Sequence, residues 1–120
     1  MTVGGHRSER VAEEIRHEVS LMLAGELKDP RLALPLNVTE VRVASGMRQA
    51  RVYVHLEGSE EERGAALEGL HAAAGFIRHE LVERLQLRRA PEILFVVDQS
   101  EEYGKHIDDL LQKVKQPEKS

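Results

Sequence analysis

The strongest constraint on the fold is a segment in which apolar and polar side chains alternate. Residues 50–56 place alanine, valine and leucine on one face of an extended chain and larger polar side chains on the other, the pattern of a strand buried on one side. Residues 38–44 are rich in β-branched side chains and predict a second strand. The stretch 45–49 between them contains a glycine and has the length of a hairpin turn. Helices are expected to cover one face of this hairpin.

A first helix is expected before the hairpin. Apolar residues recur every three or four positions from Val11 to Leu23, and Ser8 is suited to cap the helix. Asp29 and Pro30 follow the periodic segment, as at a helix end. The pattern predicts a helix over residues 8–24, preceded by a flexible tail over residues 1–6.

Two further helices in series are expected after the hairpin. Alanine and leucine dominate residues 65–74, and an apolar stripe resumes at Ile77 and continues to Leu85. We expect a kink between the two helices at Ala73, Ala74 and Gly75. The alternative is that these small residues only allow close packing of an unbroken helix.

The rest of the chain adds a strand and a short helix. Residues 93–97 are almost wholly apolar, as in a strand with covered faces. Residues 107–114 have the spacing of a short amphipathic helix, and 116–120 form a polar tail. The order predicts an α+β fold with a three-stranded sheet, which matches the αββααβ arrangement of type II KH domains. The predicted domain spans residues 7–115.

Composition excludes several classes of protein. The chain has no cysteine, which rules out disulfides and thiolate metal sites. It has no apolar run long enough to cross a membrane and no signal peptide at its start, so we expect a cytoplasmic protein. Its 17 basic and 21 acidic residues give a net charge of −4, which argues mildly against nucleic-acid binding. The distribution of charge matters more than its sum.

Seven short motifs carry a resemblance to a known family. In chain order they are RVAEEI at 10–15, KDPR at 28–31, VTEV at 38–41, ARVYV at 50–54, AGFIR at 74–78, LR at 87–88 and PEILF at 91–95. Together they resemble bacterial ribosome-binding factor A over about residues 7–111. The turn at Gly46, Met47 and Arg48 departs from the family pattern, in which an acidic residue and an aliphatic residue often follow the serine.

The resemblance implies a fold and a function. It implies a single type II KH-like RNA-binding domain with a kinked helix pair on a three-stranded sheet. The implied function is that of a monomeric assembly factor that binds the free small (30S) ribosomal subunit and its 16S rRNA. Such a factor promotes late maturation, including processing of precursor 16S rRNA, and is often linked to cold adaptation. The alternative is a small protein-interaction module without RNA contact.

Basic residues are the candidate RNA-binding groups, because lysine and arginine neutralise phosphates. They are Arg7, Arg10, Arg16, Lys28, Arg31, Arg42, Arg51, Arg78, Arg84, Arg88 and Arg89. Each of them alone is equally well explained as a solvated surface charge or as a partner of a neighbouring glutamate. Tyr53 and His55 lie on one strand face, where base stacking and ordinary sheet packing both remain open.

No catalytic constellation is found in the sequence. His79 and Glu83 are spaced to share a helix face, but a metal or acid–base site needs more groups than these two. Neither a phosphate-binding glycine loop nor a nucleophile elbow occurs. We therefore expect no enzyme activity, no cofactor and no metal.

Overall fold

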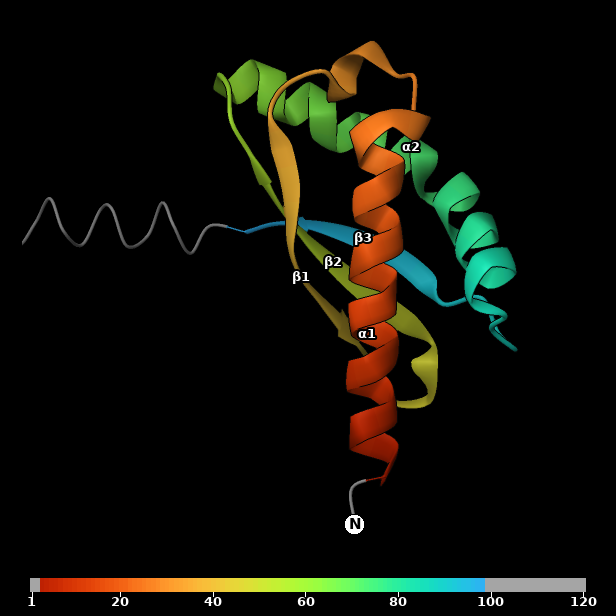
Figure 1. Cartoon of the computed structure of the whole chain (residues 1–120). Coiled ribbons are helices and arrows are strands. Elements are labelled where there is room, and N and C mark those ends of the chain that lie inside the picture. Colours follow the sequence, from red (N-terminus) through yellow and green to blue (C-terminus); the bar gives the residue numbers. More distant parts are fainter. Residues whose placement is uncertain (1–2, 99–120) are drawn as a thin grey trace, which may run out of the picture.

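The computed structural model describes residues 3–98, in which two long helices accompany a three-stranded sheet (Figure 1). The helices are α1 (Val3–Leu21) and α2 (Glu60–Leu85), and the strands are β1 (Leu36–Val43), β2 (Gln49–Leu56) and β3 (Glu92–Val97). Three short turns complete the order: η1 (Met22–Glu26) and η2 (Pro30–Leu32) precede β1, and η3 (Ser45–Met47) joins β1 to β2. The short helix expected over 107–114 and the tail 116–120 lie outside the described residues.

The sheet has the order β1-β2-β3. β1 and β2 form the expected antiparallel hairpin, whereas β2 and β3 pair in parallel. The register of the hairpin shifts between Val38 and Glu40, so Thr39 is the extra residue of a β-bulge. Because of this bulge, Val38 and Val41 both face the core although they are three residues apart.

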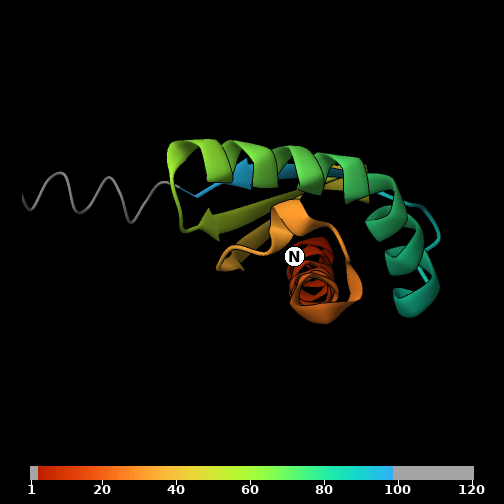
Figure 2. The ribbon, with the colours of Figure 1, turned by 90° about the horizontal axis from the view of Figure 1, so that it is seen from above.

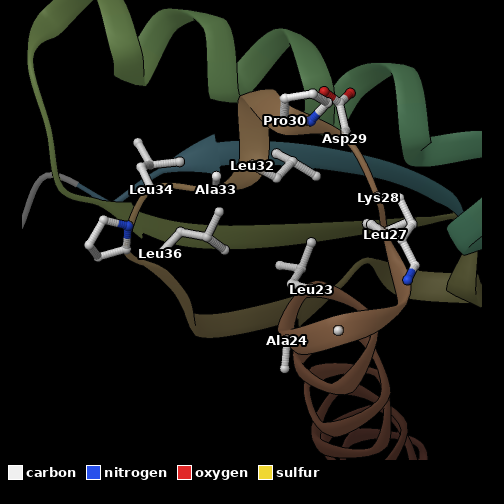
Figure 3. A pocket seen from close by; sticks show the side chains of 12 residues that line it. Leu23, Ala24, Leu27, Lys28, Asp29, Pro30, Leu32, Ala33, Leu34 and Leu36 are labelled. Atoms are coloured by element: carbon white, nitrogen blue, oxygen red, sulfur yellow. The ribbon is translucent and has the colours of Figure 1, made fainter.

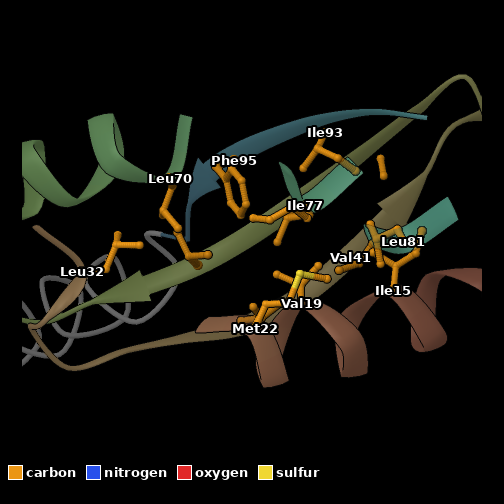
Figure 4. Close-up of a cluster of buried hydrophobic side chains, with 14 of the residues drawn as sticks. Ile15, Val19, Met22, Leu32, Val41, Leu70, Ile77, Leu81, Ile93 and Phe95 are labelled. Carbon is orange, nitrogen blue, oxygen red and sulfur yellow. The ribbon is translucent and has the colours of Figure 1, made fainter. Parts of the chain in front are cut away.

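The core lies between the helices and one face of the sheet (Figure 4). The alternating residues of β2, from Ala50 to Leu56, are buried, as their pattern predicts. Ile15 and Val19 of α1 pack from one helix, and Ile77 and Leu81 of α2 pack from the other. Ile93 and Phe95 of β3 complete the same cluster.

Helix α1 starts and ends differently from the sequence prediction. It begins at Val3, so Ser8 lies inside the helix and is not its cap. At the other end the helix widens into the π-helical turn η1, in which the N–H of Leu27 donates to the carbonyl of Met22. Capping preferences and helix breakers are local signals, and at the C-terminal end the burial of Met22 in the core overrides them.

Helix α2 is uninterrupted from Glu60 to Leu85, so its two expected segments are joined into one helix. It changes direction sharply partway along, so that its later part runs at a large angle to its first part (Figure 2), which confirms the kinked arrangement expected from the sequence. Its buried residues Ala66, Leu70, Ile77 and Leu81 are four, seven and four positions apart, so a single apolar stripe stays in phase. Ala73 and Ala74 are half-buried on this stripe, and Gly75 is exposed.

Gly69 is the glycine at which α2 makes its closest approach to another element. A Cβ atom built on Gly69 would lie 3.2 Å from Oδ2 of Asp29 and 3.3 Å from a methyl carbon of Leu32. A Cβ atom on Gly75 would meet nothing within 4 Å. The small residue that close packing requires is therefore at position 69, where η2 crosses α2.

Candidate nucleic-acid interface

Several arginines lie at the end of the sheet that carries the hairpin turn. The segments 40–51 and 86–92 contain Arg42, Arg48, Arg51, Arg88 and Arg89 against Glu40 and Glu92. We call these five arginines, together with Arg78, the arginine end. All six residues are exposed, and four of them, Arg48, Arg51, Arg88 and Arg89, have no ion pair among the described residues.

Two contacts bring these segments together. The N–H of Glu92, at the start of β3, donates to the carbonyl of Arg48 in the hairpin turn at 2.9 Å. The guanidinium of Arg78 on α2 donates to the carbonyl of Ala90 through Nε at 3.2 Å and Nη2 at 2.9 Å. Residues more than 40 positions apart in the chain thus meet at one end of the molecule.

The arginine end includes one stacked pair. Nε of Arg42 donates to Glu40 at 2.8 Å, and this hydrogen bond raises the pKa of the Arg42 guanidinium above its usual value. The same guanidinium lies 5.4 Å from the ring centroid of Tyr53, within the range of a cation–π contact. Arg51, its register partner across the hairpin, has no ion pair within the described residues.

Arg10 is an exposed residue in the N-terminal part of α1. Helix α1 runs in the direction opposite to β1 (Figure 1), and Ile15 lies near Val41 (Figure 4). The N-terminal part of α1, which contains Arg10, therefore lies toward the end of β1 that leads into the hairpin turn. Arg7 belongs to the same helix, but its side chain lies outside the described part.

Arg84 is engaged in a cluster of carboxylates. It forms ion pairs with Glu18 of α1 at 3.3 Å, with Glu26 of η1, and with Glu80 at 3.1 Å. The hydrogen bond from Arg84 lowers the pKa of the Glu26 carboxyl, and the same bond raises the pKa of Arg84. Only 27% of the Arg84 side chain is exposed. This residue joins α1 and η1 to α2.

Three other candidate residues lie away from the arginine end. Arg16 pairs with Glu13 on α1. Arg31 donates to both carboxylate oxygens of Asp29, and this contact lowers the pKa of the Asp29 carboxyl. Lys28 is exposed and has no ion pair among the described residues, but it lies beside η2. The structure thus places some of the predicted residues at the arginine end and the others at separate positions on the surface.

The opposite end of the sheet is acidic. Glu57, Glu60, Glu61 and Glu62 follow β2, and the last three lie in the first turn of α2. The seven steps of β2 from Gln49 to Leu56 span about 23 Å at roughly 3.3 Å per residue. This distance exceeds the Debye length of about 8 Å at physiological salt. The acidic end therefore hardly weakens the field of the arginine end.

A shallow groove between η1, η2 and β1 offers no catalytic arrangement (Figure 3). Leucine side chains, among them Leu23, Leu27, Leu34 and Leu36, line it beside the polar residues Lys28 and Asp29. The carboxylate at its rim, Asp29, is held by Arg31. Within residues 3–98, no group of three His, Asp or Glu side chains is placed to hold a metal ion. No described helix is long and apolar enough to span a membrane.

Sequence reasoning missed Arg48 as a member of this surface. It lies in the hairpin turn, where the chain lacks the acidic and aliphatic residues that often follow the serine in the family. The signal that identifies it is its position between two strands, one residue before β2 begins. A hairpin turn presents its side chains at the end of the sheet, beside Arg51 and the connector to β3.

The fold and this surface define a KH-like α+β domain with an exposed cluster of arginines at one end of its sheet. The family model described as ribosome-binding factor A matches residues 7–111. A ribosome-binding factor A from Acetivibrio thermocellus is 51% identical over 105 residues, covering 88% of this chain and 85% of the relative. The chain belongs to the ribosome-binding factor A family.

Solved structures agree with this assignment. The crystal structure of ribosome-binding factor A from Thermus thermophilus matches with a TM-score of 0.65 and 29% identity, covering 75% of this chain and 94% of that one. A homology model of the Thermus thermophilus factor, fitted into a cryo-EM map of its 30S complex, matches with a TM-score of 0.54 and 30% identity. That match covers 72% of this chain and 93% of the fitted model.

Proposed function

We propose that this chain binds the free small ribosomal subunit through its arginine end and promotes late maturation of that subunit, including processing of precursor 16S rRNA. Family membership supports the ribosome as partner, because the Thermus thermophilus relative was fitted into a map of a 30S complex. The protein acts as a monomer in the cytoplasm and performs no catalysis itself. The proposed contact with RNA is supported by the group of exposed arginines at one end of the sheet.

The chemistry of the arginine end favours an RNA backbone as its target. Guanidinium groups match phosphates in geometry and stay charged at any physiological pH. Arg48, Arg51, Arg88 and Arg89 have no ion pair among the described residues that would compete for them. Structured RNA is recognised largely through its shape and its phosphates. A rigid end with several such cations fits that kind of target.

Charge separation reconciles this proposal with the net charge of −4. The acidic residues Glu57 to Glu62 stand at the far end of β2, about 23 Å away at roughly 3.3 Å per residue. Local potential, and not the total charge, determines binding to a polyanion at physiological salt.

Cosedimentation tests the proposal directly. The full chain is mixed with free small subunits, free large subunits and joined ribosomes in equal amounts, and its distribution across a sucrose gradient is measured. We expect it to travel with free small subunits and much less with the other two particles. Equal association with all three, or with none, would contradict the proposal.

The acidic end supports a second candidate, a protein-interaction module. Glu57, Glu60 and Glu61 are exposed and offer a negatively charged surface to a basic protein. Replacing Glu60 and Glu61 with glutamine separates the two candidates. Loss of subunit association in this variant, together with unchanged association after loss of Arg88 and Arg89, would favour the module.

A further inference from the structure

The connector between α2 and β3 presents Arg88 and Arg89. Contacts hold the backbone of its first residues in place. Gln86 ends α2 in the left-handed conformation, with φ 53° and ψ 49°. The N–H of Leu87 donates to the carbonyl of Val82 at 3.2 Å, and the Leu87 side chain packs against the core. The chain therefore leaves α2 in a fixed direction.

Contacts also hold the backbone of the connector where it joins the sheet. Pro91 is buried, and the next residue, Glu92, donates its N–H to the carbonyl of Arg48. The fixed φ angle of proline further limits the backbone here. Three residues, Arg88, Arg89 and Ala90, remain between the two fastened ends.

Arg78 provides the contact in the middle of this stretch. Its Nε and Nη2 groups both donate to the carbonyl of Ala90, at 3.2 and 2.9 Å. Within residues 3–98, no backbone N–H outside the helices and strands donates to this carbonyl. Two donors of one planar group thus hold a carbonyl that lies directly after Arg89.

We propose that Arg78 is a positioning residue, whose guanidinium holds the Ala90 carbonyl and so fixes Arg88 and Arg89 in place before RNA arrives. This inference rests on the proposed RNA-binding function and assigns different roles to arginines of one surface. Arg88 and Arg89 contact phosphates, and Arg78 orders the backbone that presents them. Order established before binding lowers the entropy lost when the complex forms.

Arg78→Lys is the informative variant. Lysine keeps the positive charge but lacks the planar pair of donors that meets the carbonyl. If Arg78 contacted phosphate directly, lysine would preserve most of the affinity. If Arg78 positions the connector, lysine weakens binding to free small subunits by about five- to thirtyfold, as expected when one backbone residue must be ordered on binding.

Trypsin reports on the connector without any RNA. It cleaves after Arg88 and Arg89, and cleavage requires a locally opened chain, so mass spectrometry of the products follows the order of this loop. We expect faster cleavage at both bonds in Arg78→Lys than in the native chain. Arg16→Lys is the matched control, because Arg16 is also a helix residue with one local partner, and it leaves both readouts unchanged.

The dependence of binding on salt separates positioning from direct contact. A positioning residue changes affinity but leaves the slope of log affinity against log salt as it was. Loss of a phosphate contact in Arg78→Gln lowers the slope by about 0.7 to 0.9, and that result would overturn the inference. Native cleavage or native affinity in Arg78→Lys would also overturn it. If the native chain fails to bind small subunits, the proposed function falls too, which distinguishes the two failures.

Discussion

Gly69 of α2 faces the carboxylate of Asp29 so closely that a Cβ atom on the glycine would lie 3.2 Å from Oδ2. Arg31 and Leu32 crowd the same position at 3.4 and 3.3 Å. Alanine there gains helix propensity of about 1 kcal/mol but has to displace these three neighbours. The contact fixes η2, and with it Lys28, against the middle of α2.

The two helical glycines of α2 should therefore respond in opposite ways to alanine. Gly75→Ala is expected to raise the free energy of unfolding by about 0.5 to 1 kcal/mol, because the site is open and helical. The free energy of unfolding of Gly69→Ala is expected to be at least about 1 kcal/mol lower than that of Gly75→Ala, because the added methyl group overpacks the contact with η2. Urea denaturation of both variants measures this difference. Equal stabilisation by the two substitutions would show that η2 moves away freely.

Ser59 is expected to stabilise the start of α2. Its hydroxyl accepts from the N–H of Glu62 at 3.0 Å, and the Glu62 carboxylate accepts from the N–H of Ser59 at 2.8 Å. Ser59→Ala should lower the free energy of unfolding by about 1 kcal/mol. Ser59→Thr keeps the capping oxygen and serves as control. Thermal denaturation that places both variants at the same midpoint would argue against the capping role.

Arg84→Gln should lower the stability of the domain more at neutral pH than at acidic pH. The native contact lowers the pKa of Glu26, so its contribution is present above the ordinary glutamate pKa of about 4.3 and is lost as pH falls through the lowered value. Without Arg84, clustered carboxylates repel each other at pH 7. The variant should therefore be less stable than the native chain at pH 7, with a smaller difference near pH 4.

Denaturation midpoints at the two pH values measure the effect of Arg84→Gln. Arg16→Gln is the control, because it removes a single exposed ion pair with Glu13, whose side chain is 66% exposed. A deficit in Arg84→Gln that stays constant from pH 7 to pH 4 would indicate lost packing of the arginine stem and not lost ion pairing.

Removal of Arg88 and Arg89 should weaken binding to free small subunits and change its salt dependence. Replacing both with glutamine is expected to reduce the slope of log affinity against log salt by about 1.4 to 1.8, which corresponds to two phosphate contacts. Glu60→Gln with Glu61→Gln raises the net charge at the other end and should leave the slope unchanged. An equal and opposite shift in that control would mean that total charge governs binding.

The elements with local sequence signals were predicted well. The alternation in β2 depends on which face is buried, and burial leaves that mark on every second residue. The bulge at Thr39 could not be predicted, because it depends on the register against Tyr53 of the partner strand. The parallel pairing of β3 with β2 is likewise a long-range property that an apolar segment does not specify.

The candidate site was predicted less completely, for a similar reason. Arginine content identifies charge but not partners. The carboxylates that hold Arg84 include Glu18 and Glu26, which lie 66 and 58 residues away in the chain. Gly75 follows an alanine-rich stretch, and this local signal predicts a kink. The packing requirement at Gly69 instead comes from η2, nearly 40 residues earlier in the chain. The position of an interacting partner decided each of these roles.

The parallel pairing of β3 with β2 also determines when this domain can close during its own synthesis. Parallel neighbours need a long crossover connection, and here that connection is the whole of α2. β1 and β2 can pair as soon as both have been made, but Ile93 and Phe95 arrive only after residue 92. Until then Leu70, Ile77 and Leu81 have no third strand to cover. The newly made chain therefore exposes its core until β3 is released, and that interval is its period of greatest risk of aggregation.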